Sequence, residues 1–314
     1  MSSSASSFTG SSSDCTTGTP VSSDSPIREN IAAAVRRVRE TTPLAQSFTN
    51  FVTINLVANA QLAAGGTAAM SFLPDDVIET AKIAGANYIN VGTLLPFYKD
   101  ALPEIAQRLN YLGKPWVLDP VAAGIGRTRT SILQAFKAAP PTVIRANASE
   151  VIALANMWGL NTESAGDASE HRPAGVESVD DVDSATGAAV ALAWYLTEQH
   201  AKHSSHDASI PCAVAVSGIA DLVTDGETVY RLSDGSSMIT KITGAGCALG
   251  GVISTYRAVS DPLTAALSAS LLYNRAGEVA DTTSHGPGSF QVAFLDALWN
   301  VTAEQVAESE ILVQ

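Results

Sequence analysis

The chain contains little cysteine and few basic residues. Cys15, Cys212 and Cys247 are the three cysteines among 314 residues, and they form no CxxC pair. This pattern indicates neither a disulfide framework nor a zinc site. Lys and Arg number 18 against 31 Asp and Glu, a formal net charge of −13, and no basic stripe appears. The sequence therefore predicts a protein that binds neither nucleic acid nor an anionic membrane surface.

Long apolar runs and a secretory leader are also missing. No apolar stretch approaches the roughly 20 residues that a membrane-spanning helix needs. The N-terminus does not combine a basic segment, an apolar core and a cleavage motif. We therefore expect a cytoplasmic protein, and a reducing compartment suits its three widely spaced cysteines.

Large apolar side chains are scarce in residues 1–26, where Ser, Thr and Gly dominate. Such a composition buries too little surface to offset the entropy of ordering, so we expect a disordered tail there. Because the chain is 46% hydrophobic, residues 27–314 can form one sizeable domain. Within it, residues 161–184 are rich in Gly, Asp, Glu and Ser and are interpreted as a loop or insertion.

Short apolar runs alternate with helical patterns through the middle of the chain. Strands are expected at residues 67–72, 88–92, 116–119, 142–145 and 213–217, and helices at 27–40, 51–64, 75–84, 96–112, 131–138, 148–157 and 185–202. This alternation predicts an α/β fold with a parallel sheet that is covered on both faces. Turn signals predict antiparallel edge strands at residues 221–225, 228–232 and 237–242, and helices follow at 262–281 and about 286–299.

A glycine-rich turn precedes a further helical pattern near the C-terminal third of the chain. Its sequence is Thr243-Gly244-Ala245-Gly246-Cys247, and apolar residues then recur at helical spacing. The unpaired N–H groups at such a helix start favour an anion, and they are also expected to ease deprotonation of the Cys247 thiol. The alternative is a tight loop with a small buried cysteine.

Charged residues lie where predicted strands end. Asp119 closes one strand, Arg145 closes the next, and Glu150 lies one turn into the following helix. Because ligands bind beyond the carboxyl ends of parallel strands, the two carboxylates are candidates for a hydrated magnesium ion, and Arg145 for a phosphate. Taken singly, each residue also has an explanation as a helix cap or surface charge.

The two common nucleotide-binding motifs are absent. The chain has no Gly-x-x-x-x-Gly-Lys-Ser/Thr segment, and the glycines after Thr243 do not have dinucleotide-fingerprint spacing. A hydride-transferring oxidoreductase is therefore disfavoured. Phosphoryl transfer depends mainly on positioning, metal and electrostatics, so the anion site and carboxylates favour a kinase without a P-loop.

Several segments in this order resemble the hydroxyethylthiazole kinases, which belong to the ribokinase-like superfamily. They are Thr49-Asn50, Asn55, Ala58-Asn59, Lys82-Ile83-Ala84-Gly85-Ala86, Asn90-Val91-Gly92-Thr93, Leu118-Asp119-Pro120-Val121, Ile144-Arg145-Ala146-Asn147-Ala148-Ser149-Glu150, Thr243-Gly244-Ala245-Gly246-Cys247 and Gly286-Pro287-Gly288-Ser289-Phe290-Gln291. The resemblance implies a three-layer αβα ribokinase-like fold with a mostly parallel central sheet. It also implies transfer of the ATP γ-phosphoryl group to 4-methyl-5-(2-hydroxyethyl)thiazole in thiamine salvage, with Mg²⁺, by a homotrimer whose active sites lie between subunits.

Roles follow from the resemblance by position in this sequence. Asn50, Met70 and the backbone of Gly244 would contact the thiazole. Arg145, Asn147 and Ser217 would bind ATP, and Asp119 and Glu150 would arrange the magnesium ion. The loop formed by Gly244, Ala245, Gly246 and Cys247 would be the catalytic anion hole around the transferring phosphate.

The chain departs from related sequences at two of these positions. Related sugar kinases carry Asp where this chain has Cys247, and Thr is common where it has Ser217. A carboxylate is the more obvious proton acceptor, so Cys247 either positions groups or assists weakly. A kinase for another small hydroxymethyl compound, and a nucleotide-binding homologue without catalysis, are the alternatives.

Overall fold

A computed structural model describes residues 18–160, 182–203 and 210–314. In this part of the chain, ten strands form one sheet in the order β1-β10-β9-β8-β7-β6-β5-β4-β2-β3. The strands from β7 to β3 in this order are parallel, and the others pair antiparallel. Their bounds are β1 Thr19–Pro20, β2 Leu44–Phe48, β3 Thr67–Met70, β4 Ala86–Asn90, β5 Trp116–Asp119, β6 Val143–Asn147, β7 Ala213–Ser217, β8 Asp221–Thr224, β9 Val229–Leu232 and β10 Leu312–Val313.

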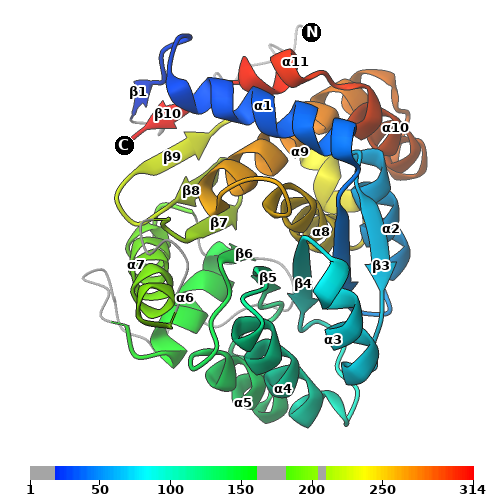
Figure 1. Ribbon diagram of the computed structural model, residues 1–314. Helices are drawn as coiled ribbons and strands as arrows, with labels where there is room; N and C mark the ends of the chain where they lie inside the picture. The colour runs from blue at the N-terminus through cyan, green and yellow to red at the C-terminus, as the bar shows by residue number, and fades with distance from the viewer. Residues whose placement is uncertain (1–17, 161–181, 204–209) are drawn as a thin grey trace, which may run out of the picture.

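Helices cover both faces of the sheet, giving the three layers visible in Figure 1. One face carries α1 (Pro26–Thr41), α2 (Ile54–Ala63), α8 (Ala245–Arg257), α9 (Pro262–Thr283), α10 (Pro287–Asn300) and α11 (Ala303–Ala307), whose apolar side chains form one buried cluster. The other carries α3 (Pro74–Ile83), α4 (Tyr98–Tyr111), α5 (Arg127–Phe136), α6 (Ala148–Met157) and α7 (Thr186–His203), with a second cluster. The predicted α/β fold with antiparallel edge strands is confirmed. None of the helices in the described ranges is long and apolar enough to cross a membrane.

The central strands are apolar until their carboxyl ends. All four residues of β5 are buried, and the strand reads Trp-Val-Leu before it ends at Asp119. Asn90, the last residue of β4, lies opposite Asp119, and Asn147 of β6 lies opposite Ser217 of β7. Because parallel strands end at one edge, polar groups from β4, β5, β6 and β7 gather there.

One expectation about secondary structure is wrong, and a central strand was not predicted. Residues 237–242 do not form a strand, since Ser237–Lys241 is a 3-10 helix (η1), and the Ser236 hydroxyl caps it by accepting a hydrogen bond from the N–H of Met238. The segment before Asn50 forms a strand, β2, which lies between β3 and β4 in the sheet and was not predicted.

The expected tail extends too far. Thr19–Pro20 form β1, which pairs with β10 at the edge of the sheet, so the boundary at residue 26 is too late. Strand pairing supplies the backbone hydrogen bonds that the local composition does not predict. Residues 1–17 and 161–181 lie outside the described residues, so the remaining tail and most of the insertion stay predictions.

Candidate active site

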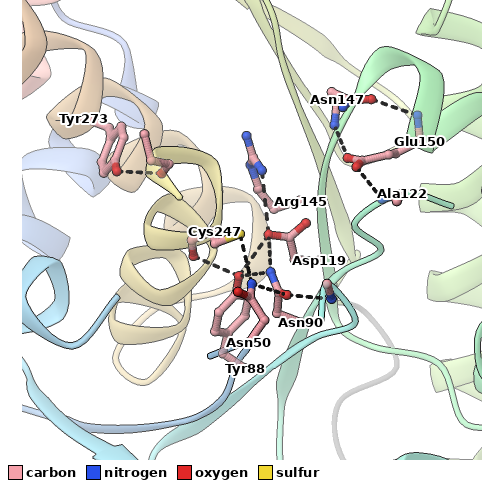
Figure 2. A network of polar contacts seen from close by, with 12 residues as sticks. Asn50, Tyr88, Asn90, Asp119, Ala122, Arg145, Asn147, Glu150, Cys247 and Tyr273 are labelled. Carbon is pink, nitrogen blue, oxygen red and sulfur yellow. Dashed lines mark hydrogen bonds and ion pairs between the residues drawn. The ribbon is translucent and has the colours of Figure 1, made fainter. Parts of the chain in front are cut away.

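Side chains from neighbouring elements meet at the carboxyl edge of the sheet in a buried polar network (Figure 2). Asn50 follows β2, Asn90 and Asp119 end β4 and β5, Arg145 lies in β6, and Cys247 lies in the first turn of α8. All five are buried. The structure therefore brings together four residues that the sequence singled out separately, Asn50, Asp119, Arg145 and Cys247.

Asp119 is at the centre of this network and is fully buried. Its Oδ2 accepts hydrogen bonds from the Tyr88 hydroxyl and from Asn90 Nδ2, both at 2.9 Å, and lies 3.7 Å from Nη1 of Arg145. Burial raises the pKa of Asp119, although Arg145 and these hydrogen bonds act in the opposite direction. Oδ1 is buried without a hydrogen-bond partner among the described residues, which leaves it available to a metal-bound water or a cation.

Glu150 is held by the start of helix α6. Its Oε2 accepts a hydrogen bond from the N–H of Asn147, whose side chain caps the Glu150 N–H, so the two residues form a capping box. Oε1 accepts from the N–H of Ala122, which follows β5. Burial, together with the charge of Asp119, raises the pKa of Glu150. The carboxylate is therefore rigid, and each oxygen keeps a further lone pair for a water molecule.

The two carboxylates suit a hydrated magnesium ion better than a metal held by protein alone. The described ranges contain no group of three or more His, Cys, Asp or Glu residues able to hold a metal. Mg²⁺ usually keeps several waters and takes one or two carboxylates plus phosphate oxygens. The unpartnered Oδ1 of Asp119 and the fixed carboxylate of Glu150 fit that coordination.

Arg145 directs a buried positive charge at the start of helix α8. Its guanidinium packs on the backbone of Gly246, where an added Cβ would lie only 2.6 Å from Nη1. Gly244 caps this helix with a φ of +85°, a conformation that favours glycine. The helix N-terminus carries a partial positive charge, so a guanidinium beside it raises the local positive potential. The pair is arranged for an anion.

Cys247 does not have the reactive thiol expected from its place in the first helical turn. Its Sγ is buried, 3.6 Å from Nδ2 of Asn50. Burial, followed by the negative charge of Asp119, raises the pKa of this thiol to about 11. The expectation of easier deprotonation is therefore wrong, because desolvation and a nearby carboxylate oppose the thiolate.

The other predicted residues flank the network along the sheet edge. Ser217 ends β7 beside the β6 strand of Arg145, and Met70 ends β3 beside β2; both are half-buried. In strand order, the residues expected for ATP lie on β7 and β6, the metal carboxylate on β5, and those expected for the thiazole at β2 and β3. The predicted nucleotide and acceptor residues thus lie on opposite sides of Asp119.

Two members of the network were not assigned roles from the sequence. Asn90 closes β4 and could have been found by the rule that selects strand ends. Tyr88 is an aromatic residue within an apolar strand, a pattern typical of core packing. Its hydroxyl contacts become visible only in the assembled structure.

Comparison with known proteins identifies the family. The model of the Hydroxyethylthiazole kinase family matches residues 35–304. A hydroxyethylthiazole kinase of Bifidobacterium longum (strain DJO10A) is 91% identical over the full length of both chains, and one of Bifidobacterium adolescentis is 67% identical over 91% of this chain and 95% of its own.

Solved structures agree with this assignment. The structure of a hydroxyethylthiazole kinase protein from Pyrococcus horikoshii OT3 has a TM-score of 0.74 at 27% identity, covering 91% of this chain and 99% of the other. A pyridoxal kinase from Staphylococcus aureus in complex with ADP shares the fold, with a TM-score of 0.52 at 15% identity over 76% of this chain and 89% of its own. From the family match and the full-length relatives, this chain belongs to the hydroxyethylthiazole kinase family.

Proposed function

We propose that this protein transfers the γ-phosphoryl group of ATP to the hydroxyethyl group of 4-methyl-5-(2-hydroxyethyl)thiazole, a step of thiamine salvage. Membership of the family supports the reaction. The observation that carries the proposal at the level of the site is the guanidinium of Arg145 against Gly246 at the start of α8, with Asp119 beside it.

The nucleotide is proposed to lie over the ends of β6 and β7. Arg145 would pair with phosphate oxygens, since a guanidinium binds them through charge-assisted hydrogen bonds. Ser217 and Asn147, opposite each other in the strand register, would contact ATP nearby. The charges of Asp119, at 3.7 Å, and of Glu150 both act on Arg145, and a phosphate group would give its guanidinium a further acceptor.

Asp119 and Glu150 are proposed to arrange the magnesium ion through bound water. When bound, the ion neutralises charge on the phosphate oxygens during transfer. Asp119 contributes the unpartnered Oδ1, and Glu150 contributes a carboxylate fixed by the backbone N–H groups of Asn147 and Ala122.

The first turn of α8 is proposed to hold the transferring phosphoryl group. The loop of Gly244, Ala245, Gly246 and Cys247 would form the anion hole through its backbone N–H groups, since the first N–H groups of a helix lack intrahelical partners. The N–H of Ala245 already donates to the carbonyl oxygen of Ile242 at 3.2 Å, so the N–H groups of Gly244, Gly246 and Cys247 are the donors assigned to the anion. With a pKa of about 11, the Cys247 thiol is protonated at neutral pH. We therefore assign Cys247 a positioning role rather than that of a general base.

The acceptor alcohol is proposed to bind between Asn50, Met70 and the backbone of Gly244. Asn50 is held in place, because its Nδ2 donates to Asn90 Oδ1 at 3.0 Å and its Oδ1 accepts from the N–H of Val52. This position next to Cys247 would present the hydroxyl of the alcohol to the start of α8.

We further propose that the protein works in the cytoplasm as a homotrimer with active sites between subunits, as the family resemblance implies. Exposed apolar side chains near Asn50, including Phe51 at 43%, Val52 at 66% and Leu73 at 60%, support this arrangement because a neighbouring subunit would cover them. Sedimentation of the purified chain as a monomer would contradict it. Cys212 and Cys247 are both free thiols, which suits a reducing compartment.

The test of the activity is ATP consumption with the thiazole beside a panel of pyrimidine and sugar alcohols. We expect magnesium-dependent formation of ADP and of the thiazole phosphate. Turnover with another alcohol but not with the thiazole would assign the site to a different acceptor, and no turnover despite nucleotide binding would identify an inactive homologue.

A further inference from the structure

The Tyr88 hydroxyl lies between the candidate metal carboxylate and the anion-binding helix (Figure 2). It is 2.9 Å from Oδ2 of Asp119 and 2.8 Å from the carbonyl oxygen of Cys247 in the first turn of α8. Asn90 Nδ2 donates a hydrogen bond to the hydroxyl oxygen at 3.0 Å. Tyr88 is thus a direct link between β5 and α8.

A phenol carries one proton, so it can donate to Asp119 or to the Cys247 carbonyl but not fully to both. A carboxylate attracts this proton more strongly than a neutral carbonyl, because hydrogen bonds to ionised acceptors are the stronger ones. A cation at Asp119 would weaken that attraction. The proton would then turn to the Cys247 carbonyl and hold the first turn of α8.

Gly250 makes this arrangement possible. It lies in α8, on the turn after Cys247, and an added Cβ would lie 2.5 Å from Cε2 and 2.8 Å from the hydroxyl oxygen of Tyr88. The ring therefore packs directly on the helix backbone. Any side chain at position 250 would displace the phenol from its two oxygen partners.

The geometry points to Tyr88 as a positioning residue that couples magnesium binding at Asp119 to anion binding at the start of α8. This inference rests on the proposed function, and it deepens the account of that same site. It requires that the metal improve nucleotide affinity by more than its direct contacts with the phosphates would, because the hydroxyl fixes the helix turn that receives the phosphate.

The experiment measures the affinity of the full chain for a non-hydrolysable ATP analogue by calorimetry, with and without Mg²⁺. The ratio of the two affinities is the magnesium enhancement. The main variant is Tyr88→Phe, which removes the hydroxyl and keeps the ring. The matched control is Tyr256→Phe in α8, the helix that Tyr88 contacts; the buried hydroxyl of Tyr256 has no hydrogen-bond partner in the described part of the chain.

We expect Tyr88→Phe to lower the magnesium enhancement about 10-fold, because substitutions of residues that hydrogen-bond to metal-binding side chains typically have effects of this size. The metal-free affinity should be unchanged. Tyr256→Phe should keep the enhancement of the unaltered protein. Gly250→Ala is a second variant, which keeps the Tyr88 hydroxyl but displaces it, and it should also lower the enhancement.

Two results would overturn the role of Tyr88 and leave the proposed function standing. One is an equal enhancement in Tyr88→Phe and the unaltered protein, and the other is an equal loss in Tyr88→Phe and Tyr256→Phe. If the unaltered protein bound no nucleotide, the proposed function would be overturned together with this inference. Measurement of the unaltered protein separates that case from the first two.

Discussion

Cys247 offers the sharpest test of the electrostatics of the site. Its thiol pKa is raised from 9.0 to about 11, first by burial and then by Asp119. A pKa of about 11 in place of 9.0 lowers the thiolate fraction at neutral pH about 100-fold. Because the thiolate is the reactive species, we expect Cys247 to react slowly with iodoacetamide and to react faster as the pH rises towards 11.

The assay follows carboxamidomethylation of the Cys247 peptide by mass spectrometry between neutral pH and the onset of alkaline unfolding. Limited access slows labelling similarly at every pH, so the shape of the profile reports the pKa. The same peptide in urea is the reference, and its labelling should level off near the ordinary thiol pKa. A native profile that also levels off near pH 9.0 would refute the argument from burial.

The same shift predicts how stability depends on pH. The pKa is higher in the folded state. Below the unfolded pKa of 9.0 the thiol is protonated in both states, so it does not lower the stability there. As the pH rises to about 11, only the unfolded state releases this proton, and the free energy of unfolding falls by up to about 3 kcal/mol. Cys247→Ser should remove that part of the loss, and its turnover should stay within about tenfold if the thiol is not the base. Identical alkaline stability curves for the two proteins would contradict the prediction.

Three further predictions concern the groups around the thiol. Gly246→Ala places a Cβ 2.6 Å from the Arg145 guanidinium and should weaken ATP binding measured by calorimetry by about 10-fold, a loss of ~1.4 kcal/mol. Gly288→Ala, which meets nothing within 4 Å, is the control and should bind ATP normally. Asn147→Ala breaks the capping box that orients Glu150 and should cost about 1 kcal/mol of stability in urea and also lower turnover. Thr302→Ala, which breaks the similar capping box of α11, should lose comparable stability while turnover is unchanged. Asp119→Asn removes the charge that would hold the metal and should lower ADP formation about 100-fold; an unaltered magnesium titration curve would reject this role.

The positions of the charged site residues were predictable because they follow from a rule about strand ends. Asp119 closes β5, and the carboxyl ends of parallel strands share one edge. Arg145 was expected to close its strand, but β6 continues to Asn147, so Arg145 lies two residues before the strand end. The same rule would have found Asn90. It could not have found Tyr88, because the value of that residue lies in a hydroxyl that reaches α8, more than 150 positions away in the chain.

Local patterns also failed where distant pairing decides the structure. The β2 segment contains Gln46 and Ser47, yet it is a buried strand because β3 and β4 flank it and Gln61 of α2 accepts a hydrogen bond from the Ser47 hydroxyl. Residues 237–242 read as a strand, but Ser237–Lys241 form a 3-10 helix that Ser236 caps. The burial of β2 depends on distant neighbours such as β4, which no short sequence window contains, whereas the 3-10 helix depends on the adjacent Ser236.

What the sequence determined by itself is the family, the α/β alternation and the candidate residues of a phosphoryl-transfer site, since these depend on residue types, order and spacing. The tertiary structure alone decided how those residues act on one another. It placed the Cys247 thiol beside Asp119 in a buried environment, which makes it a weak acid, and it set the Tyr88 hydroxyl between Asp119 and α8. Burial and charge are properties of surroundings, and the surroundings of a residue come from segments far away in the chain.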